Sequence, residues 1–202
     1  KFAQFYAGKS HKFGSDPEVT DFAIGYRSAA RTRKADAFLA LAEIEKINDF
    51  QKSAALEQAA YYSRKEAGPI VELIPVEVVK KTAQMQHLLI QGKAPEVISR
   101  FANEDITQWP FWKRGDGYRN RGRAYYITKA GAKAETDLSK ALPWTSDPGA
   151  RGATLLMLAQ NRERNLGDDD RALQAYNAIV AGRERIGGAD QFYALQGIAR
   201  IL

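Results

Sequence analysis

Apolar residues recur along most of the chain at intervals of three and four, the spacing that places them on one face of an α-helix. In residues 17–31, Phe22, Tyr26 and Ala30 share such a face, and Pro17 stands in the first turn, where proline favours a helix start. The same periodicity, interrupted mostly by Pro, Gly and Asn-Asp, predicts further helices over residues 35–47, 53–66, 77–91, 95–102, 111–128, 131–142, 149–165, 170–185 and 189–202. The pattern therefore predicts an all-α protein.

The composition is consistent with an all-α globular protein and excludes several classes of protein. Among 202 residues, 45% are apolar, which is enough for a substantial core. The strongest apolar run, residues 153–159, is far shorter than the roughly 18 residues that a membrane span needs. We therefore expect a soluble protein without a membrane span, and the compartment stays open between cytoplasm and periplasm. The absence of cysteine excludes disulfides, thiolate zinc sites and cysteine nucleophiles.

A helix–turn–helix pattern recurs in the C-terminal half. Its best copy combines aromatic, small and apolar residues at fixed spacings: Tyr118, Gly122, Tyr125, Ala134, Leu138 and Ala141. The small residues Gly122 and Ala134 would let two helices approach closely, while Tyr125 and Leu138 would fill the space around that contact. The pattern returns at Leu156, Ala159, Ala172 and Tyr176, and it begins again at residues 193–197, where Gly197 corresponds to Gly122. Upstream, Gly25, Ala37, Leu41 and Ile44 fit it loosely, and residues 48–80 depart from it.

This pattern resembles the tetratricopeptide (TPR) repeat family, most clearly over residues 111–202. The resemblance implies a right-handed α-solenoid of helix–turn–helix repeats. It divides the chain into an irregular arm (1–16), degenerate helical repeats (17–104) and TPR-like repeats (105–202). The last predicted helix matches the first helix of a repeat, so we expect the repeats to continue beyond the chain end or to meet a partner there. An ordinary helical bundle is the alternative.

The resemblance also implies a function, because in this family the first helices of the repeats line a concave groove that binds peptides. The chain would then be a non-catalytic protein–protein interaction scaffold within a larger assembly. The aligned groove positions are Asp116, Arg119, Arg123, Tyr126, Met157, Asn161 and Arg164. This mixture of arginines, an asparagine and an aromatic residue favours a protein partner with an acidic peptide, although the lysines of the family's best-known carboxylate clamp are missing. The alternatives are a helical accessory domain of a larger enzyme and an RNA-binding helical repeat.

The helix predicted from residue 111 is strongly basic. Residues 113–133 contain Lys113, Arg114, Arg119, Arg121, Arg123, Lys129 and Lys133 against the single acid Asp116, a local excess as large as the net charge of +6 of the whole chain. A solvated face, a site for an acidic peptide and a nucleic-acid site are three interpretations of such a run. Nucleic acid is the less favoured partner, because no interleaved platform of aromatic and basic residues accompanies the charge.

Residues that could carry out chemistry are few and isolated. His11 and His87 have no histidine at i+4, so no helical metal pair exists, and no serine stands in a nucleophile-elbow context. Residues 168–170 are all aspartates, and we expect them to cap the following helix instead of holding calcium. Trp109, Phe111 and Trp112 cluster around Pro110, and we expect them to anchor a loop on the preceding helices, with a ligand site as the alternative. We accordingly expect no enzyme activity, no catalytic residue, no metal and no cofactor.

Overall fold

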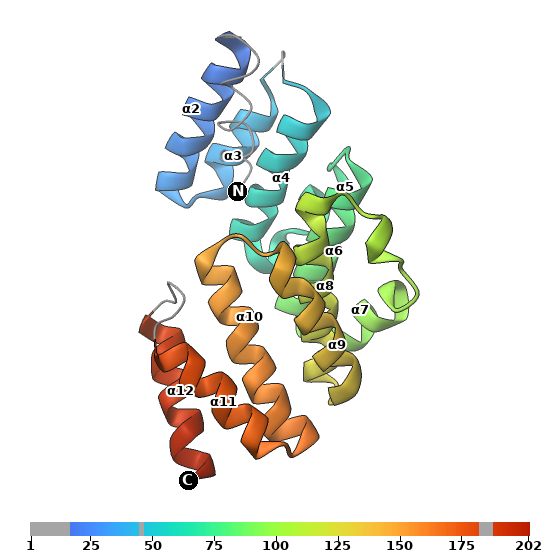
Figure 1. Cartoon of the computed structure of the whole chain (residues 1–202). Coiled ribbons are helices and arrows are strands. Elements are labelled where there is room, and N and C mark those ends of the chain that lie inside the picture. Colours follow the sequence, from blue (N-terminus) through green and yellow to red (C-terminus); the bar gives the residue numbers. More distant parts are fainter. Residues whose placement is uncertain (1–16, 45–46, 182–187) are drawn as a thin grey trace. The chain divides into compact units, whose positions relative to one another are not determined.

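A computed structural model describes residues 17–44, 47–181 and 188–202 (Figure 1). In this part of the chain the structure contains eleven α-helices and no β-strand, which confirms the all-α prediction. The predicted arm at residues 1–16, with His11, lies outside the described residues. The contacts divide the chain into two units, residues 1–91 and 92–202. No helix in the described part is long and apolar enough to cross a membrane.

The first unit is a set of successive helices packed through their neighbours. They are α2 (Pro17–Thr32), α3 (Ala35–Ala42), α4 (Asp49–Ser63), α5 (Gly68–Glu72) and α6 (Glu77–Ile90), with a short 3-10 turn at Arg64–Glu66. Helix α3 contacts α2 and α4, and α4 also contacts α5 and α6. The loose upstream match has a physical basis at one position, because the Cα of Gly25 faces Leu41 so closely that a Cβ would lie 3.0 Å from the Leu41 side chain.

Aromatic rings form the centre of the first unit. Phe38 is fully buried, with its ring centroid 5.4 Å from that of Tyr26 and 5.7 Å from that of Tyr62. Tyr26 comes from α2, Phe38 from α3 and Tyr62 from α4, so the three rings join three helices. Burial raises the pKa of the Tyr26 hydroxyl above its ordinary value, and the nearby Glu57 carboxylate adds to that rise.

The second unit follows the same principle of sequential packing. Its elements are α7 (Ala94–Phe101), a 3-10 turn at Ile106–Gln108, α8 (Phe111–Ile127), α9 (Gly131–Ala141), a 3-10 turn at Leu142–Trp144, α10 (Pro148–Asn161), a π-helical turn η4 (Arg162–Leu166), α11 (Asp169–Val180) and α12 (Gly188–Ile201). Helix α9 contacts α8 and α10, and α11 contacts α10 and α12. Helix α7 packs on α8, so it belongs with the helices after the predicted boundary at residues 104–105.

The small residues of the C-terminal pattern lie where two helices touch. A Cβ on Gly122 would lie 2.9 Å from Cγ of Leu138 and 3.1 Å from the Leu138 backbone nitrogen, so α8 and α9 approach closely there. In the next pair, Ala159, Ala172 and Tyr176 are all fully buried in one cluster. The expectation for Gly197 is wrong. Gly197 faces the ring of Tyr176 on the preceding helix, not a following helix, so it does not correspond to Gly122.

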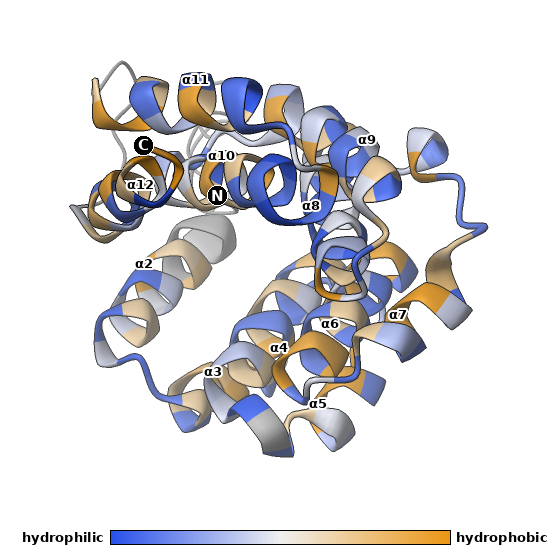
Figure 2. Ribbon diagram, turned by 90° about the horizontal axis from the view of Figure 1, so that it is seen from below, coloured by the Kyte–Doolittle hydropathy of each residue, from blue (hydrophilic) through white to orange (hydrophobic). Residues whose placement is uncertain are grey.

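The structure also allows the predictions for one helix end and one loop to be compared with the observed contacts. The Asp168 side chain accepts a hydrogen bond from the Arg171 amide and so caps α11, as predicted. Trp109 is buried, donates from Nε1 to Glu104 and packs against Gly117 of α8, as expected of a residue that anchors the loop, whereas its neighbour Phe111 is 58% exposed. Figure 2 shows that polar and apolar positions alternate along α11, as expected of a helix that buries one side.

Candidate functional site

The π-turn η4 continues α10 and ends at Gly167 in the left-handed conformation (φ 63°), and its side chains reach several other helices of the second unit. A π-turn holds one more residue than an α-turn, so successive side chains leave the helix in an unusual set of directions. Arg162 Nη2 pairs with Glu135 Oε1 of α9 at 2.8 Å. Asn165 Nδ2 donates to the backbone oxygen of Tyr126 at 3.1 Å. The turn therefore joins α10 to both helices of the preceding hairpin.

Glu163 connects the same turn to α11 and α12. Its carboxylate accepts hydrogen bonds from the Tyr176 hydroxyl of α11 and from Arg200 Nε and Nη2 of α12, the last two at 2.8 and 2.9 Å. The hydrogen bond from Arg200 is the main cause that holds the pKa of Glu163 below its ordinary value, and the bond from Tyr176 adds to it. Burial, together with Glu163, raises the pKa of Tyr176 above its ordinary value.

The structure brings several predicted groove residues to one surface. Arg164 Nη1 lies 3.4 Å from the Tyr126 hydroxyl, which in turn lies 3.4 Å from Oε1 of Gln160. Met157 is half-buried and packs against the same apolar cluster as Tyr126. Arg123, one helical turn before Tyr126 on α8, is exposed. We call these five residues, Arg123, Tyr126, Met157, Gln160 and Arg164, the Tyr126 surface.

Two other predicted groove residues, Asp116 and Arg119, lie one to two turns before Arg123 on α8 and form an ion pair with each other. Arg119 Nη2 pairs with Asp116 Oδ1 at 2.8 Å, and Lys113 Nζ lies 3.5 Å from Asp116 Oδ2. Because its guanidinium is already paired with a carboxylate, Arg119 offers less charge to a ligand than Arg123 does.

Asn161 is not a groove residue, which corrects the sequence prediction. It is fully buried, its amide nitrogen donates to the backbone oxygen of Gly131 at 3.0 Å, and its oxygen accepts from Asn165. Aligning the buried small residues Gly122 and Ala159 places Gln160 opposite Arg123, one residue before Asn161. An alignment of Gly122 with Ala159 would therefore have predicted Gln160, and not Asn161, as the surface residue.

The basic run is not one open face either. Lys113 is only 4% exposed. Arg114 donates to the backbone oxygen of Trp109, and its guanidinium lies 4.9 Å from the ring centre of Trp144. Arg121 is paired with Asp137 in the interior. With Arg119 also paired, the exposed cations of the run are Arg123, Lys129 and Lys133.

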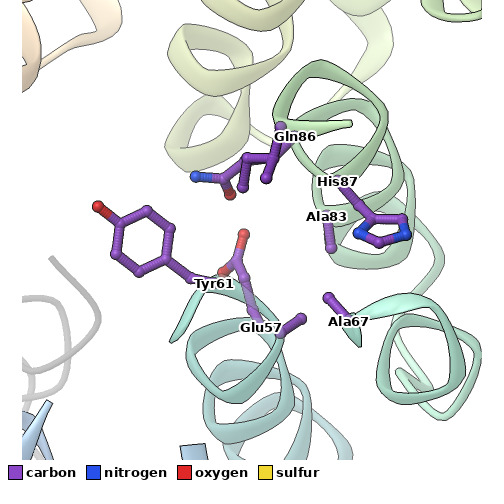
Figure 3. A pocket seen from close by; sticks show the side chains of 8 residues that line it. Glu57, Tyr61, Ala67, Ala83, Gln86 and His87 are labelled. Atoms are coloured by element: carbon purple, nitrogen blue, oxygen red, sulfur yellow. The ribbon is translucent and has the colours of Figure 1, made fainter. Parts of the chain in front are cut away.

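The first unit contains a small recess, shown in Figure 3, with room for about one water molecule. Glu57, Tyr61 and Gln86 line it, and His87 stands beside Ala83. His87 Nδ1 lies 3.2 Å from the backbone oxygen of Arg64, which can only accept, and Nε2 lies 2.9 Å from the amide nitrogen of Gln91, which can only donate. Both ring nitrogens of His87 are therefore engaged by neighbouring polar groups.

Among the described residues, no three His, Asp or Glu side chains gather closely enough to hold a metal ion. No family model, no curated protein and no solved structure matches the chain. Any functional inference therefore depends on the geometry of the chain itself, above all on the Tyr126 surface.

Proposed function

We propose that the chain is a TPR-like α-solenoid scaffold that binds an acidic peptide of a partner protein on the Tyr126 surface and carries out no catalysis. The observation that supports this most directly is the approach of Arg164 Nη1 to the Tyr126 hydroxyl, at 3.4 Å. The two residues stand on different hairpins, and the repeat spacing alone assigned both to one groove.

The exposed arginines supply recognition of charge. A guanidinium forms two parallel hydrogen bonds to a carboxylate, so Arg123 and Arg164 suit Asp or Glu side chains or a peptide carboxylate. Each exposed pair contributes only about 0.2–1 kcal/mol, and salt weakens it. Charge alone therefore gives selectivity for acidic peptides without sufficient affinity.

Apolar and neutral polar groups of the Tyr126 surface complete the site. Tyr126 and Met157 are both half-buried, so a peptide side chain could cover the parts that remain exposed. The Gln160 amide can bond to a peptide backbone. The bond from Asn165 to the Tyr126 backbone fixes the surface before a ligand arrives, which lowers the entropic cost of binding.

Charge reversal at Arg123 and Arg164 tests the proposal. The variant Arg123→Glu with Arg164→Glu should lose the partners that the parent captures from native extract, while the melting temperature stays the same because both side chains are exposed. Arg119 is left intact, since reversing it would place two acids beside each other at Asp116.

The matched control is Lys129→Glu with Lys133→Glu, which changes the net charge equally on exposed residues near the α8–α9 connection. This control should retain the partners. If it loses them to the same extent, only the net charge matters and the Tyr126 surface is not the site. Capture that disappears after nuclease treatment would point to RNA and also overturn the proposal.

A further inference from the structure

Four exposed cations of the first unit gather at one end of α2. Arg27, Arg31, Arg33 and Lys34 stand within eight residues, on the last turns of α2 and in the two-residue connection to α3, and all four are exposed. In the described part of the chain, no carboxylate or other polar group engages these four side chains. We call them the α2 basic patch. It differs from the basic run of α8, where most cations have partners within the chain.

The outer side of α2 combines these cations with an apolar side chain. Ile24, Arg27 and Arg31 are spaced by three and four residues, so they lie on one side of the helix. Phe22 and Ala29, on the opposite side, are buried. Ile24 is 60% exposed. The outer side of α2 therefore presents an isoleucine next to cations, and the connection to α3 extends the charge.

Two arginines at this end of the unit have backbone conformations that favour glycine. Arg33 has φ 54° and Arg64, the C-cap of α4, has φ 52°; among the described residues of the first unit they are the only non-glycine residues with positive φ. The ring contacts of Phe38 with Tyr26 and Tyr62 bring the end of α4 close to the α2–α3 connection (Figure 1). Backbone strain of this kind concentrates at functional positions, and here both strained residues carry an exposed guanidinium.

Charge decides which occupant suits the α2 basic patch. Residues 1–16 contain three lysines against the single acid Asp16, so their charge does not complement the patch. In a symmetric dimer the patch would meet its own copy, and the like charges would repel each other. Asp36 is the only acid in residues 22–42. The patch therefore attracts a polyanion from outside the chain.

We propose that the α2 basic patch binds the surface of an anionic lipid bilayer, with Ile24 inserted among the headgroups. A guanidinium forms paired hydrogen bonds with a phosphate, and a cluster of cations on a helix beside an apolar side chain suits such a surface. The short connection between two packed helices lets the charges touch a flat surface together.

Single-stranded RNA is a less suitable occupant of the patch. Sequence-tolerant binding of RNA depends on aromatic side chains on which the bases stack. The aromatic residues of α2 and α3 are Phe22, Tyr26 and Phe38; the two phenylalanines are buried and Tyr26 is half-buried against Phe38. The described part of these two helices therefore presents cations and an isoleucine, but no exposed ring.

Vesicles of phosphatidylcholine with about 30% phosphatidylserine serve as the probe. The purified chain should sediment with them at about 0.05 M salt, should be released at about 0.5 M salt, and should not bind vesicles of phosphatidylcholine alone. Arg27→Glu with Lys34→Glu should weaken binding at least about 25-fold, because each cation at an anionic surface contributes about fivefold in affinity. Both positions are exposed, so this variant should retain the parental circular dichroism spectrum.

Two single variants separate binding from folding. Arg33→Gly should weaken vesicle binding about fivefold without lowering the melting temperature, because glycine adopts a positive φ without strain. If Arg33 served only the fold, this variant would bind like the parent chain. Ile24→Ser should weaken binding at least about threefold through the loss of apolar burial, and equal binding would contradict the insertion of Ile24.

The controls separate this patch from the Tyr126 surface and from net charge. Arg123→Glu with Arg164→Glu and Lys129→Glu with Lys133→Glu each change the net charge as much as the double variant of the patch does, and both should bind vesicles within about twofold of the parent. An equal loss in either control would overturn the proposal, and so would full vesicle binding by the double variant of the patch. Tighter binding of an RNA of about 20 nucleotides, or of a poly-glutamate peptide of about 20 residues, with the same loss in that variant, would also overturn it.

Discussion

Arg121 and Asp137 form a two-point ion pair inside the second unit, with Arg121 Nε 2.6 Å from Asp137 Oδ2 and Nη2 3.1 Å from Oδ1. The side chains are only 11% and 5% exposed. Arg121 Nη1 also donates to the backbone oxygens of Phe101 and Glu104, at 3.2 and 2.8 Å. One guanidinium on α8 therefore connects α9 with the end of α7.

Arg121→Met should lower the free energy of unfolding by about 3–5 kcal/mol, because Asp137 would remain buried without its partner charge. Urea unfolding followed by circular dichroism measures this. The matched control, Arg123→Met on the exposed side of α8, should stay within about 0.5 kcal/mol of the parent. Adding Asp137→Leu to Arg121→Met removes the unpaired charge and should recover part of the loss. A double variant as unstable as the sum of its parts would contradict this account.

Gly122→Ala should destabilise the chain by about 1–3 kcal/mol, because the new methyl group would press on Leu138, including its backbone nitrogen. The control is Gly188→Ala at the start of α12, where an added Cβ meets no atom within 4 Å. Thermal melting compares the two. Equal melting temperatures would mean that α8 and α9 are not in close contact at Gly122.

Gly197→Ala should be more damaging than Gly122→Ala, since a Cβ would lie 2.3 Å from Cζ of Tyr176 and the hydroxyl of that ring is held by Glu163. Tyr176→Leu removes the obstructing ring at the cost of a cavity. In the Tyr176→Leu background the alanine should therefore cost less, with a coupling energy of about 0.5–3 kcal/mol in a double-mutant cycle. If the stability losses of the two single variants simply add in the double variant, Gly197 and Tyr176 are not in contact.

Glu163 should make stability depend on pH in a defined direction. Its folded-state pKa lies below its ordinary value of 4.5, mainly because Arg200 donates to the carboxylate. The resulting stabilisation is fully present above the ordinary pKa and is lost as pH falls through the lower folded-state pKa. The stability difference between the parent chain and Glu163→Gln should therefore be constant near neutral pH and shrink below about pH 4.5. Urea unfolding at several pH values measures it.

Helical periodicity was sufficient to predict most elements of the fold. The segments 131–142 and 189–202 correspond to α9 and α12 within a residue. The helix predicted over residues 53–66 begins too late, because Asn48-Asp49 is more than a break between two helices. Asn48 is in fact the cap of α4, with Gln51 in a reciprocal capping box. The short helix α5 is absent from the prediction, because Gly and Pro predict an interruption there, whereas Pro69 stands in the first turn of this helix.

The candidate site was predictable only where it depends on repeat spacing. Spacing assigns Tyr126, Arg164 and Asn161 to one surface; the first two side chains do lie close together, whereas Asn161 is buried. The π-turn could not be predicted, because it depends on partners distant in sequence, such as Tyr176 and Arg200, and not on local helix propensity. The count of charges along residues 113–133 includes Arg121 in the basic run. It does not show that Asp137 pairs with Arg121 in the interior, so that Arg121 adds no charge to the surface.

The π-turn has a consequence for how the second unit comes apart. In a simple array of repeats each helix pair contacts only its neighbours and can open from one end. Here consecutive residues of one turn contact α8, α9, α11 and α12. Loss of any one of these helices breaks contacts that also hold the others. Amide hydrogen exchange in α9 and α12 should therefore share a common opening free energy, so that helices α8 to α12 unfold as one cooperative block without fraying helix by helix.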